Sequence, residues 1–144
     1  MIKYGKQSLD ENDINAVIDT LNSDWLTQGP KVEEFEEAVA DYCASKYAVA
    51  VCNGTAALHL ANLVLGTDRT TNVITTPITF LATSNSVLYA GGHPVFADIS
   101  QGVFTLDPKQ VKKLTEGDIG YKGIIPVHLG GVVCDMDRLK KIAE

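Results

Sequence analysis

The sequence predicts an α/β fold in which a mostly parallel sheet is flanked by helices. From residue 47 onward, short β-rich runs alternate with segments of helical periodicity. The β-rich runs are apolar on both faces, as is typical of parallel strands covered by helices on either side. With 144 residues, 45% of them hydrophobic, the chain is long enough for one sizeable core. We therefore predict a single unit, residues 1–144, with right-handed crossovers between its strands.

Two amphipathic helices precede the alternating region. Ser8 and Glu11 have the spacing of a capping box, and apolar residues then recur with the period of a helix at Ile14, Val17, Ile18 and Leu21. The run "SDWLTQGP" ends this helix, and Pro30 is well placed near the start of the next. The second helix has an apolar stripe opposite four glutamates, which we interpret as a solvated face.

The strands and helices that follow alternate regularly. The predicted strands are residues 47–52, 72–76, 93–99 and 122–128. The predicted helices are residues 55–66, 79–92, 107–117 and a last one that starts after Asp135. In open sheets of this kind, ligands bind beyond the carboxyl ends of the strands. The segments to inspect are therefore residues 53–55, 76–80, 98–100 and 128–131.

The turn between the first strand and its helix has two interpretations. Gly54, Thr55 and Ala56 lie at a helix N-terminus, where free backbone N–H groups and a threonine hydroxyl favour an anion such as phosphate. Alternatively, Thr55 only caps its own helix and Gly54 only relieves a tight turn. No Walker lysine follows and no G-x-G-x-x-G motif is present. Local spacing alone leaves both interpretations open.

The segment "TTPITFLAT" raises a similar choice for Phe80. An aromatic ring at the rim of the sheet can stack on a planar cofactor, but the same residue can belong to an ordinary helix–sheet core. His128 also follows a strand and could pair with Ser84 or Asp98 as in a hydrolase triad, yet no G-x-S-x-G elbow surrounds any serine. Asp135, beside Cys134, is more simply a helix N-cap than part of a metal or redox cluster.

Charge and cysteine usage narrow the function classes. The formal charge of −6 and the absence of a basic run argue against a nucleic-acid or anionic-membrane surface. Three cysteines without C-x-x-C spacing fit reduced thiols, and no zinc or other metal pattern is present. No apolar run approaches the roughly 18 residues that span a bilayer, and no signal-peptide pattern opens the chain. We therefore expect a cytoplasmic protein.

Three longer segments carry a recognisable pattern in a fixed order: "NSDWLTQGPKVEEFEEAVADYCASKYAVAVCNGTAALHLA", "VITTPITFLATSNSVLYAGGHPVFADI" and "IIPVHLGGVVCDMDRLKKIA". Together they resemble the first part of the DegT/DnrJ/EryC1/StrS aminotransferases, which use pyridoxal 5′-phosphate to act on nucleotide-linked sugars. The segments "YGKQSL" and "LTQGP" look most like the branch that aminates a UDP-4-keto-6-deoxy amino sugar for pseudaminic acid. The resemblance implies the N-terminal portion of the large domain of a fold type I, aspartate-aminotransferase-like enzyme.

The resemblance also implies roles for individual residues. Gly54, Thr55 and Ala56 match the turn that holds the cofactor phosphate, and Phe80 matches the aromatic residue that stacks on the pyridine ring. Candidate substrate contacts are Tyr4, Thr27, Gln28 and His128. The partners implied are a nucleotide-sugar substrate, glutamate as amino donor, and a second subunit in a homodimer.

No catalytic residue is expected within this chain. The family's Schiff-base lysine and the aspartate that pairs with the pyridine nitrogen are expected beyond Glu144, and Lys122 stands at the wrong end of its strand. We therefore expect the 144-residue chain alone to be inactive, with an unpaired sheet edge and uncovered apolar helix faces. Three alternatives stay open: a non-catalytic fragment, a sugar dehydratase of the same family, and an unrelated flavodoxin-like or Rossmann-type binding module.

Overall fold

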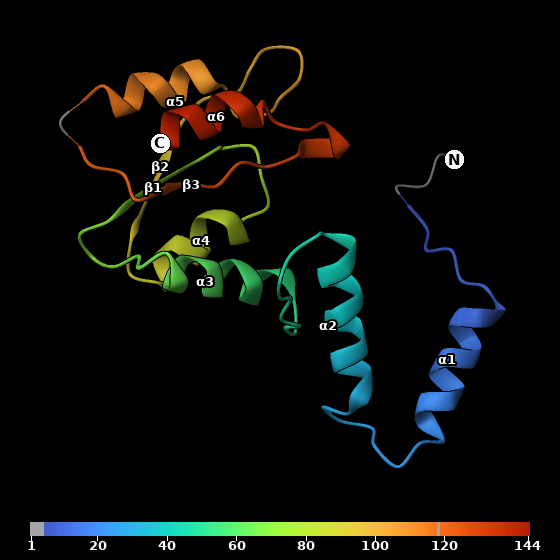
Figure 1. Cartoon of the computed structure of the whole chain (residues 1–144). Helices are drawn as coiled ribbons and strands as arrows, with labels where there is room; N and C mark the ends of the chain where they lie inside the picture. The colour runs from blue at the N-terminus through green and yellow to red at the C-terminus, as the bar shows by residue number, and fades with distance from the viewer. Residues whose placement is uncertain (1–4, 118) are drawn as a thin grey trace. The chain divides into compact units, whose positions relative to one another are not determined.

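The computed structural model describes residues 5–117 and 119–144 and divides the chain into two compact units, residues 1–50 and 51–144 (Figure 1). Residues 5–50 of the first unit form two helices. The second holds the sheet and the helices that cover it. The prediction that residues 1–144 form one incomplete part of a larger domain stays a prediction.

In the first unit, α1 spans Glu11–Leu21 and α2 spans Pro30–Tyr42. The capping box predicted at Ser8 is wrong by two residues, because Asp10 is the N-cap. Its carboxylate accepts the backbone N–H of Asp13 at 3.1 Å, and the Asp13 carboxylate accepts the N–H of Asp10 at 2.9 Å. Asp10 at the N-cap and Asp13 three residues later thus form the capping box and satisfy two free backbone N–H groups without Ser8. As predicted, Pro30 is in the first turn of α2.

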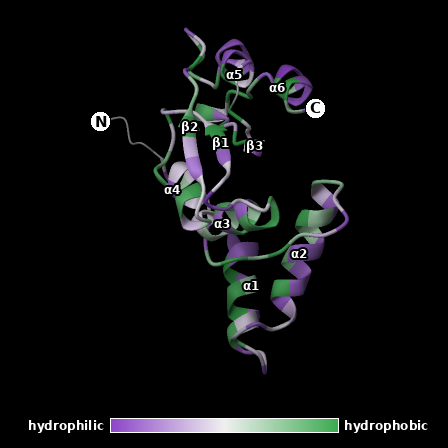
Figure 2. Cartoon of the chain, turned by 90° about the vertical axis from the view of Figure 1, so that its left-hand side faces the viewer, coloured by the Kyte–Doolittle hydropathy of each residue, from purple (hydrophilic) through white to green (hydrophobic). Residues whose placement is uncertain are grey.

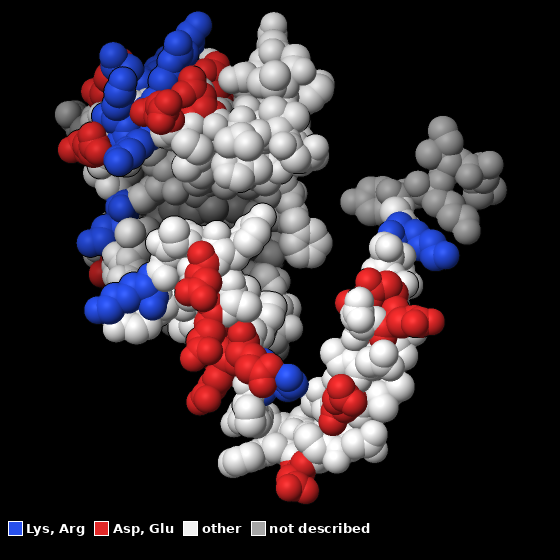
Figure 3. Space-filling view, turned by 45° about the vertical axis from the view of Figure 1, so that its right-hand side comes forward, with Lys and Arg blue, Asp and Glu red and all other residues white. Residues whose placement is uncertain are grey.

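The first unit exposes the apolar side of its helices. Along α1, Val17 and Leu21 are 60% and 64% exposed, and Phe35 on α2 is 59% exposed. Figure 2 shows the hydrophobic residues along α1. The acidic side chains of both helices are visible in Figure 3. A groove between the two helices is lined by Val17, Leu21, Leu26 and Phe35, among others. An apolar stripe exposed to this extent favours association with another surface.

We therefore expect the purified chain to self-associate with rising concentration, and a Val17→Ser/Leu21→Ser variant to do so less, because each substitution removes exposed apolar area from α1. Static light scattering over a concentration series measures the average mass. Asn15→Ser, which changes the same helix away from the stripe, is the control. A wild-type chain that stays monomeric throughout, or a double variant as associated as wild type, contradicts the prediction.

In the second unit, three parallel strands form a sheet in the order β2-β1-β3. They are β1 (Asn72–Thr75), β2 (His93–Phe96) and β3 (Gly123–Ile124). Ile74 faces Val95 on one side and Ile124 on the other. The three predicted strands in this region are thus confirmed, each with a shorter paired length. The parallel sheet is also confirmed.

Four helices in the described part of the second unit cover this sheet. They are α3 (Gly54–Val64), α4 (Ala82–Tyr89), α5 (Pro108–Thr115) and α6 (Met136–Ala143), and a short 3₁₀ turn, η1 (Leu129–Gly131), precedes the last. Figure 1 shows α3 and α4 on one side of the sheet and α5 and α6 on the other. Asp135 caps α6 as predicted, because its carboxylate accepts the N–H of Arg138 at 3.2 Å. The predicted helices are confirmed, with differences at their ends.

The predicted strand over residues 47–52 is not found in the described structure. A β-rich run becomes a strand only when a neighbouring strand supplies the ladder of hydrogen bonds. The described strands pair only with one another, and the N–H of Ala50 donates instead to the carboxylate of Glu36, at 2.7 Å. Val49 accordingly stays 75% exposed.

The helix pairs on the two sides of the sheet make different contacts. On the α5 and α6 side, Ile74 contributes to an apolar cluster with residues of the loops and helices: Ala97, Leu106, Val111, Cys134 and Leu139. Between α3 and α4, the buried amide of Asn62 donates to the hydroxyl of Ser86 at 3.1 Å and to the carbonyl of Leu58 at 2.9 Å. The Ser86 hydroxyl donates in turn to the carbonyl of Thr83. The α3–α4 contact therefore includes a buried, hydrogen-bonded polar pair.

Candidate functional site

The candidate site lies at the carboxyl edge of the sheet. Because β1, β2 and β3 are parallel, their carboxyl ends share one edge. The C-terminal end of α3 lies at the opposite edge, since Leu65 contacts Gly123 at the start of β3. The N-terminus of α3 therefore points toward the carboxyl edge, and Figure 1 shows this arrangement. Gly54, Thr55 and Phe80 thus belong to the same edge.

The N-terminus of α3 is capped by Asn53. The side-chain oxygen of Asn53 accepts the N–H of Ala56 at 2.9 Å, and its carbonyl accepts the N–H of Ala57 at 3.2 Å. The alternative that Thr55 only caps its own helix is therefore wrong. Within the described residues, the N–H groups of Gly54 and Thr55 and the Thr55 hydroxyl make no hydrogen bond. Three donors at the positive end of a helix are thus free for an anion.

Phe80 is 78% exposed, so the alternative of an ordinary core residue is wrong. It follows β1 in a loop that is held by hydroxyl groups. The buried Thr76 hydroxyl accepts the N–H of Ile78 at 3.3 Å, and the hydroxyls of Thr79 and Thr83 lie 2.8 Å apart. These contacts fix the start of α4 while the ring remains open to solvent. An exposed ring on a fixed loop is suited to stacking on a planar ligand.

His128 closes the turn that follows β3. Its Nδ1 accepts the backbone N–H of Cys134 at 3.1 Å, and the Cys134 thiol donates to the carbonyl of Val127 at 3.1 Å. Sequence reasoning placed His128 at this edge but missed its bond to Cys134. The bond joins residues on either side of a turn with two left-handed glycines, Gly130 and Gly131, whose geometry the sequence pattern does not reveal.

The remaining predicted contacts lie in the first unit or outside the described residues. Thr27 and Gln28 precede α2 and are exposed, and Gln28 has a left-handed backbone, with φ of 48°. Tyr4 lies outside the described residues.

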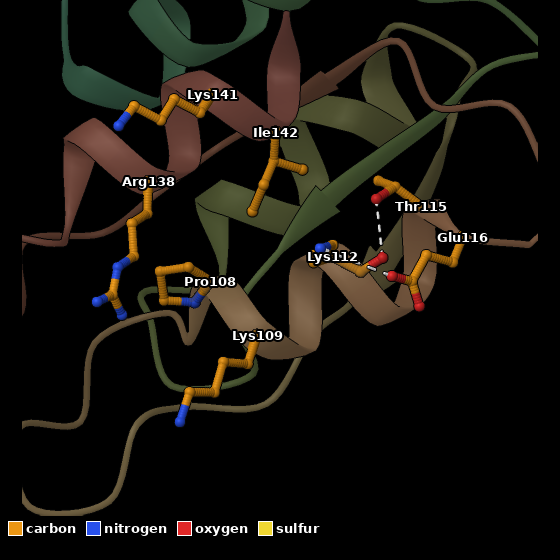
Figure 4. A pocket seen from close by; sticks show the side chains of 8 residues that line it. All are labelled: Pro108, Lys109, Lys112, Thr115, Glu116, Arg138, Lys141 and Ile142. Carbon is orange, nitrogen blue, oxygen red and sulfur yellow. Dashed lines mark hydrogen bonds and ion pairs between the residues drawn. The ribbon is translucent and has the colours of Figure 1, made fainter.

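A hollow on the outer side of α5 and α6 contains none of the predicted site residues (Figure 4). Basic side chains flank it from both helices, namely Lys109, Lys112, Arg138 and Lys141. Lys112 pairs with Glu116 at 4.0 Å, and Arg138 pairs with Asp135 at 3.3 Å. Exposed pairs of this kind contribute little to stability.

The electrostatics of the second unit suit an anionic ligand. Residues 1–50 contain ten acidic and four basic side chains, whereas residues 51–144 contain eight of each, so the net charge of −6 belongs to the first unit. The hydrogen bond from the Thr70 hydroxyl lowers the pKa of Asp68 most, and the hydrogen bond from the Thr70 N–H lowers it further. That carboxylate precedes β1, at the edge opposite the candidate site. An anion at the N-terminus of α3 therefore meets no net repulsion from its own unit.

Comparison with known proteins identifies the family. The sequence pattern of the DegT/DnrJ/EryC1/StrS aminotransferase family matches residues 7–144. This chain belongs to that family. The resemblance stated from the three sequence segments is thus confirmed, as is the fold type I architecture of its solved relatives.

Individual relatives agree with this assignment. Over 144 residues the chain is 40% identical to the GDP-perosamine synthase of Caulobacter vibrioides, covering 99% of the chain and 38% of that protein. It is 38% identical over 144 residues to the UDP-4-amino-4,6-dideoxy-N-acetyl-beta-L-altrosamine transaminase of Campylobacter jejuni, covering 100% of the chain and 38% of that protein. The Spr1654 protein of Streptococcus pneumoniae in its PLP form superposes with a TM-score of 0.87 at 34% identity, covering 98% and 36% of the two chains.

The chain therefore spans a little over a third of the length of these DegT/DnrJ/EryC1/StrS relatives. Within that third it contains the α3 N-terminus, Phe80 and His128.

In the part of the chain that the structure describes, no helix is long and apolar enough to cross a membrane. The same part has no group of three or more His, Cys, Asp or Glu residues arranged to hold a metal ion.

Proposed function

We propose that this chain supplies the phosphate and ring contacts of a pyridoxal-phosphate-dependent aminotransferase that acts on a nucleotide-linked keto sugar. The observation that carries the proposal is the pairing of a helix N-terminus whose first N–H donors are free with an exposed aromatic ring, Phe80, at the same sheet edge. A phosphate tail and a flat ring are the two features of pyridoxal phosphate that such a pair can bind.

In this proposal the phosphate binds at the N-terminus of α3. The N–H groups of Gly54 and Thr55 and the Thr55 hydroxyl donate to its oxygens, and the helix dipole favours its charge. The N–H of Ala56 is already taken by the side chain of Asn53 at 2.9 Å. Its expected contact with phosphate therefore requires Asn53 to share or release that bond.

Phe80 orients the ring of the cofactor. When bound, pyridoxal phosphate supplies an aldehyde that bonds to amines and a ring that withdraws electrons from the reacting carbon. The face of Phe80 restricts the ring to one plane and excludes water from one side of it. The lysine that bonds the aldehyde and the aspartate that pairs with the protonated pyridine nitrogen are expected in the part of the family chain that lies beyond Glu144. We expect the 144 residues alone to bind without turnover.

For the reaction itself we propose transfer of an amino group from glutamate to a UDP-linked 4-keto-6-deoxy amino sugar, in a surface polysaccharide or pseudaminic acid pathway. The names of two relatives, one a GDP-sugar synthase and one a UDP-sugar transaminase, support the nucleotide-sugar class. Thr27, Gln28 and His128 are the proposed substrate contacts among the described residues. We also propose that the full-length enzyme is a homodimer.

Binding of pyridoxamine 5′-phosphate tests the cofactor site, because this probe lacks the aldehyde that would react with surface lysines. By isothermal titration, Thr55→Val is expected to weaken binding about tenfold, the effect of losing one charge-assisted hydrogen bond. Binding of phosphate-free pyridoxamine should be unchanged in this variant. Phe80→Ala should weaken binding of both probes by about tenfold, because it removes ring stacking.

Thr115→Val and Phe35→Ala serve as matched controls. The Thr115 hydroxyl bonds to its own helix and Phe35 is an exposed ring in the first unit. Both should bind pyridoxamine 5′-phosphate as wild type does. Equal affinity of the wild-type chain for the two probes, or unchanged affinity in Thr55→Val, would rule out the proposed phosphate site.

A further inference from the structure

The turn after β3 is closed by hydrogen bonds from both ends. The N–H of Cys134 donates to Nδ1 of His128 at 3.1 Å, and the Cys134 thiol donates to the carbonyl of Val127 at 3.1 Å. Cys134 is 3% exposed and packs into the apolar cluster beside Leu139. His128 is therefore anchored through a buried residue, although its own side chain is exposed.

This contact assigns the proton of the neutral imidazole. A ring nitrogen that accepts an N–H cannot itself carry hydrogen, so the proton of the neutral ring is on Nε2. The two ring nitrogens point in different directions, and Nε2 has no partner among the described residues. His128 thus offers an N–H donor in the loop that follows β3, at the carboxyl edge of the sheet.

We propose that His128 is a ligand-binding residue whose Nε2–H donates to a phosphate or carboxylate oxygen of the bound cofactor or substrate, and that Cys134 is the residue that positions it. The proposal rests on the proposed function, because it needs a ligand at this edge. The donor atom of His128 is Nε2, and the donated hydrogen is the one that the neutral ring carries there. The fixed ring lowers the cost of forming the bond, because its orientation is set before the ligand arrives.

The proton assignment is measured first, on the wild-type chain without ligand. Nitrogen-15 and carbon-13 spectra of the neutral His128 ring report which nitrogen carries hydrogen. We expect the Nε2–H form. A ring protonated on Nδ1, or exchanging between both forms, overturns the proposal whatever the ligand results.

Two substitutions then distinguish the role of Nδ1 from that of Nε2. In His128→Asn the side-chain oxygen lies where Nδ1 was and still accepts the N–H of Cys134, but no donor remains at the Nε2 position. In His128→Gln the amide lies near the Nε2 position and restores a donor there. The probes are pyridoxamine 5′-phosphate, UDP and L-glutamate, which distinguish cofactor phosphate, substrate diphosphate and donor carboxylate.

We expect one probe to shift the Nε2–H resonance of the wild-type chain. The same probe should bind His128→Asn about tenfold more weakly and His128→Gln less weakly than that, with the thermal midpoint of His128→Asn close to wild type. If no probe shifts the resonance, or if His128→Asn binds as wild type does, the proposal fails. Thr55→Val still tests the cofactor site separately, so the two failures are distinguishable.

Discussion

Replacing Gly92 by alanine is expected to lower the free energy of unfolding by about 3 kcal/mol, because there is no room for a side chain at this position. A Cβ atom there would collide with the Cγ2 methyl of Thr67 and lie 3.2 Å from Cγ1 of Val87 and 3.3 Å from the carbonyl oxygen of Thr71. The carbonyl belongs to the backbone that leads into β1, so it cannot move away without disturbing the sheet. Urea denaturation followed by circular dichroism measures the change.

Gly120→Ala is the matched control, because a Cβ atom at Gly120 meets no atom within 4 Å. Its stability should be unchanged or slightly raised, since alanine restricts the unfolded chain more than glycine does. If Gly92→Ala unfolds at the same urea concentration as Gly120→Ala, the close packing of Thr67, Val87 and Thr71 around Gly92 is wrong.

Ile74→Ala is expected to lower the free energy of unfolding by about 3 to 4 kcal/mol, through lost apolar burial and the cavity that remains. Ile74 is fully buried on the central strand and belongs to the cluster that joins the sheet to α5 and α6. Its neighbours in the ladder are fixed by backbone hydrogen bonds, including Ile125 N–H to the carbonyl of Ile74 at 2.8 Å. The cavity therefore cannot collapse easily. Ile74→Val should cost only about 1 kcal/mol.

Ile78→Ala makes the same chemical change four residues later, at a side chain that is 41% exposed. Its effect on the free energy of unfolding should be about 1 kcal/mol or less, because little burial is lost. Equal effects of the two alanine substitutions would contradict the assignment of Ile74 to the core.

The sequence predicted most of the fold because its signals are local. Alternating β-rich and helical segments determine the order of elements, and runs such as residues 72–76, with four β-branched residues in five, favour strands. The strand predicted over residues 47–52 failed for a non-local reason, since pairing depends on a neighbour that residue pattern does not supply. Strand composition alone cannot say whether a partner is present.

The sequence predicted at which edge of the sheet the candidate site lies, but not the details of its geometry. The rule that ligands bind beyond parallel strands applies to Phe80 and His128, which follow β1 and β3. Thr55 reaches the same edge at the N-terminus of α3 and not behind a paired strand. That these residues bind a ligand stays a prediction. Which residue caps α3 was not predictable, because Asn53 and Thr55 are both good N-caps and only backbone geometry selects Asn53, with φ of −169° and ψ of 170°. The exposure of Phe80 and the bond between His128 and Cys134 depend on loop conformation, which short-range patterns do not determine.

The Asn62–Ser86 contact between α3 and α4 has a consequence for how this sequence can vary. Dispersion contacts have no direction, so the cluster around Leu106 and Val111 can exchange one apolar side chain for another of similar volume. The Asn62–Ser86 contact must keep a donor and an acceptor in register, and a buried group left without its partner is costly. Sequence drift is therefore freer beneath α5 and α6. At Asn62 and Ser86, between α3 and α4, fewer residue types can replace the native ones. The first turn of α3 forms the proposed phosphate site.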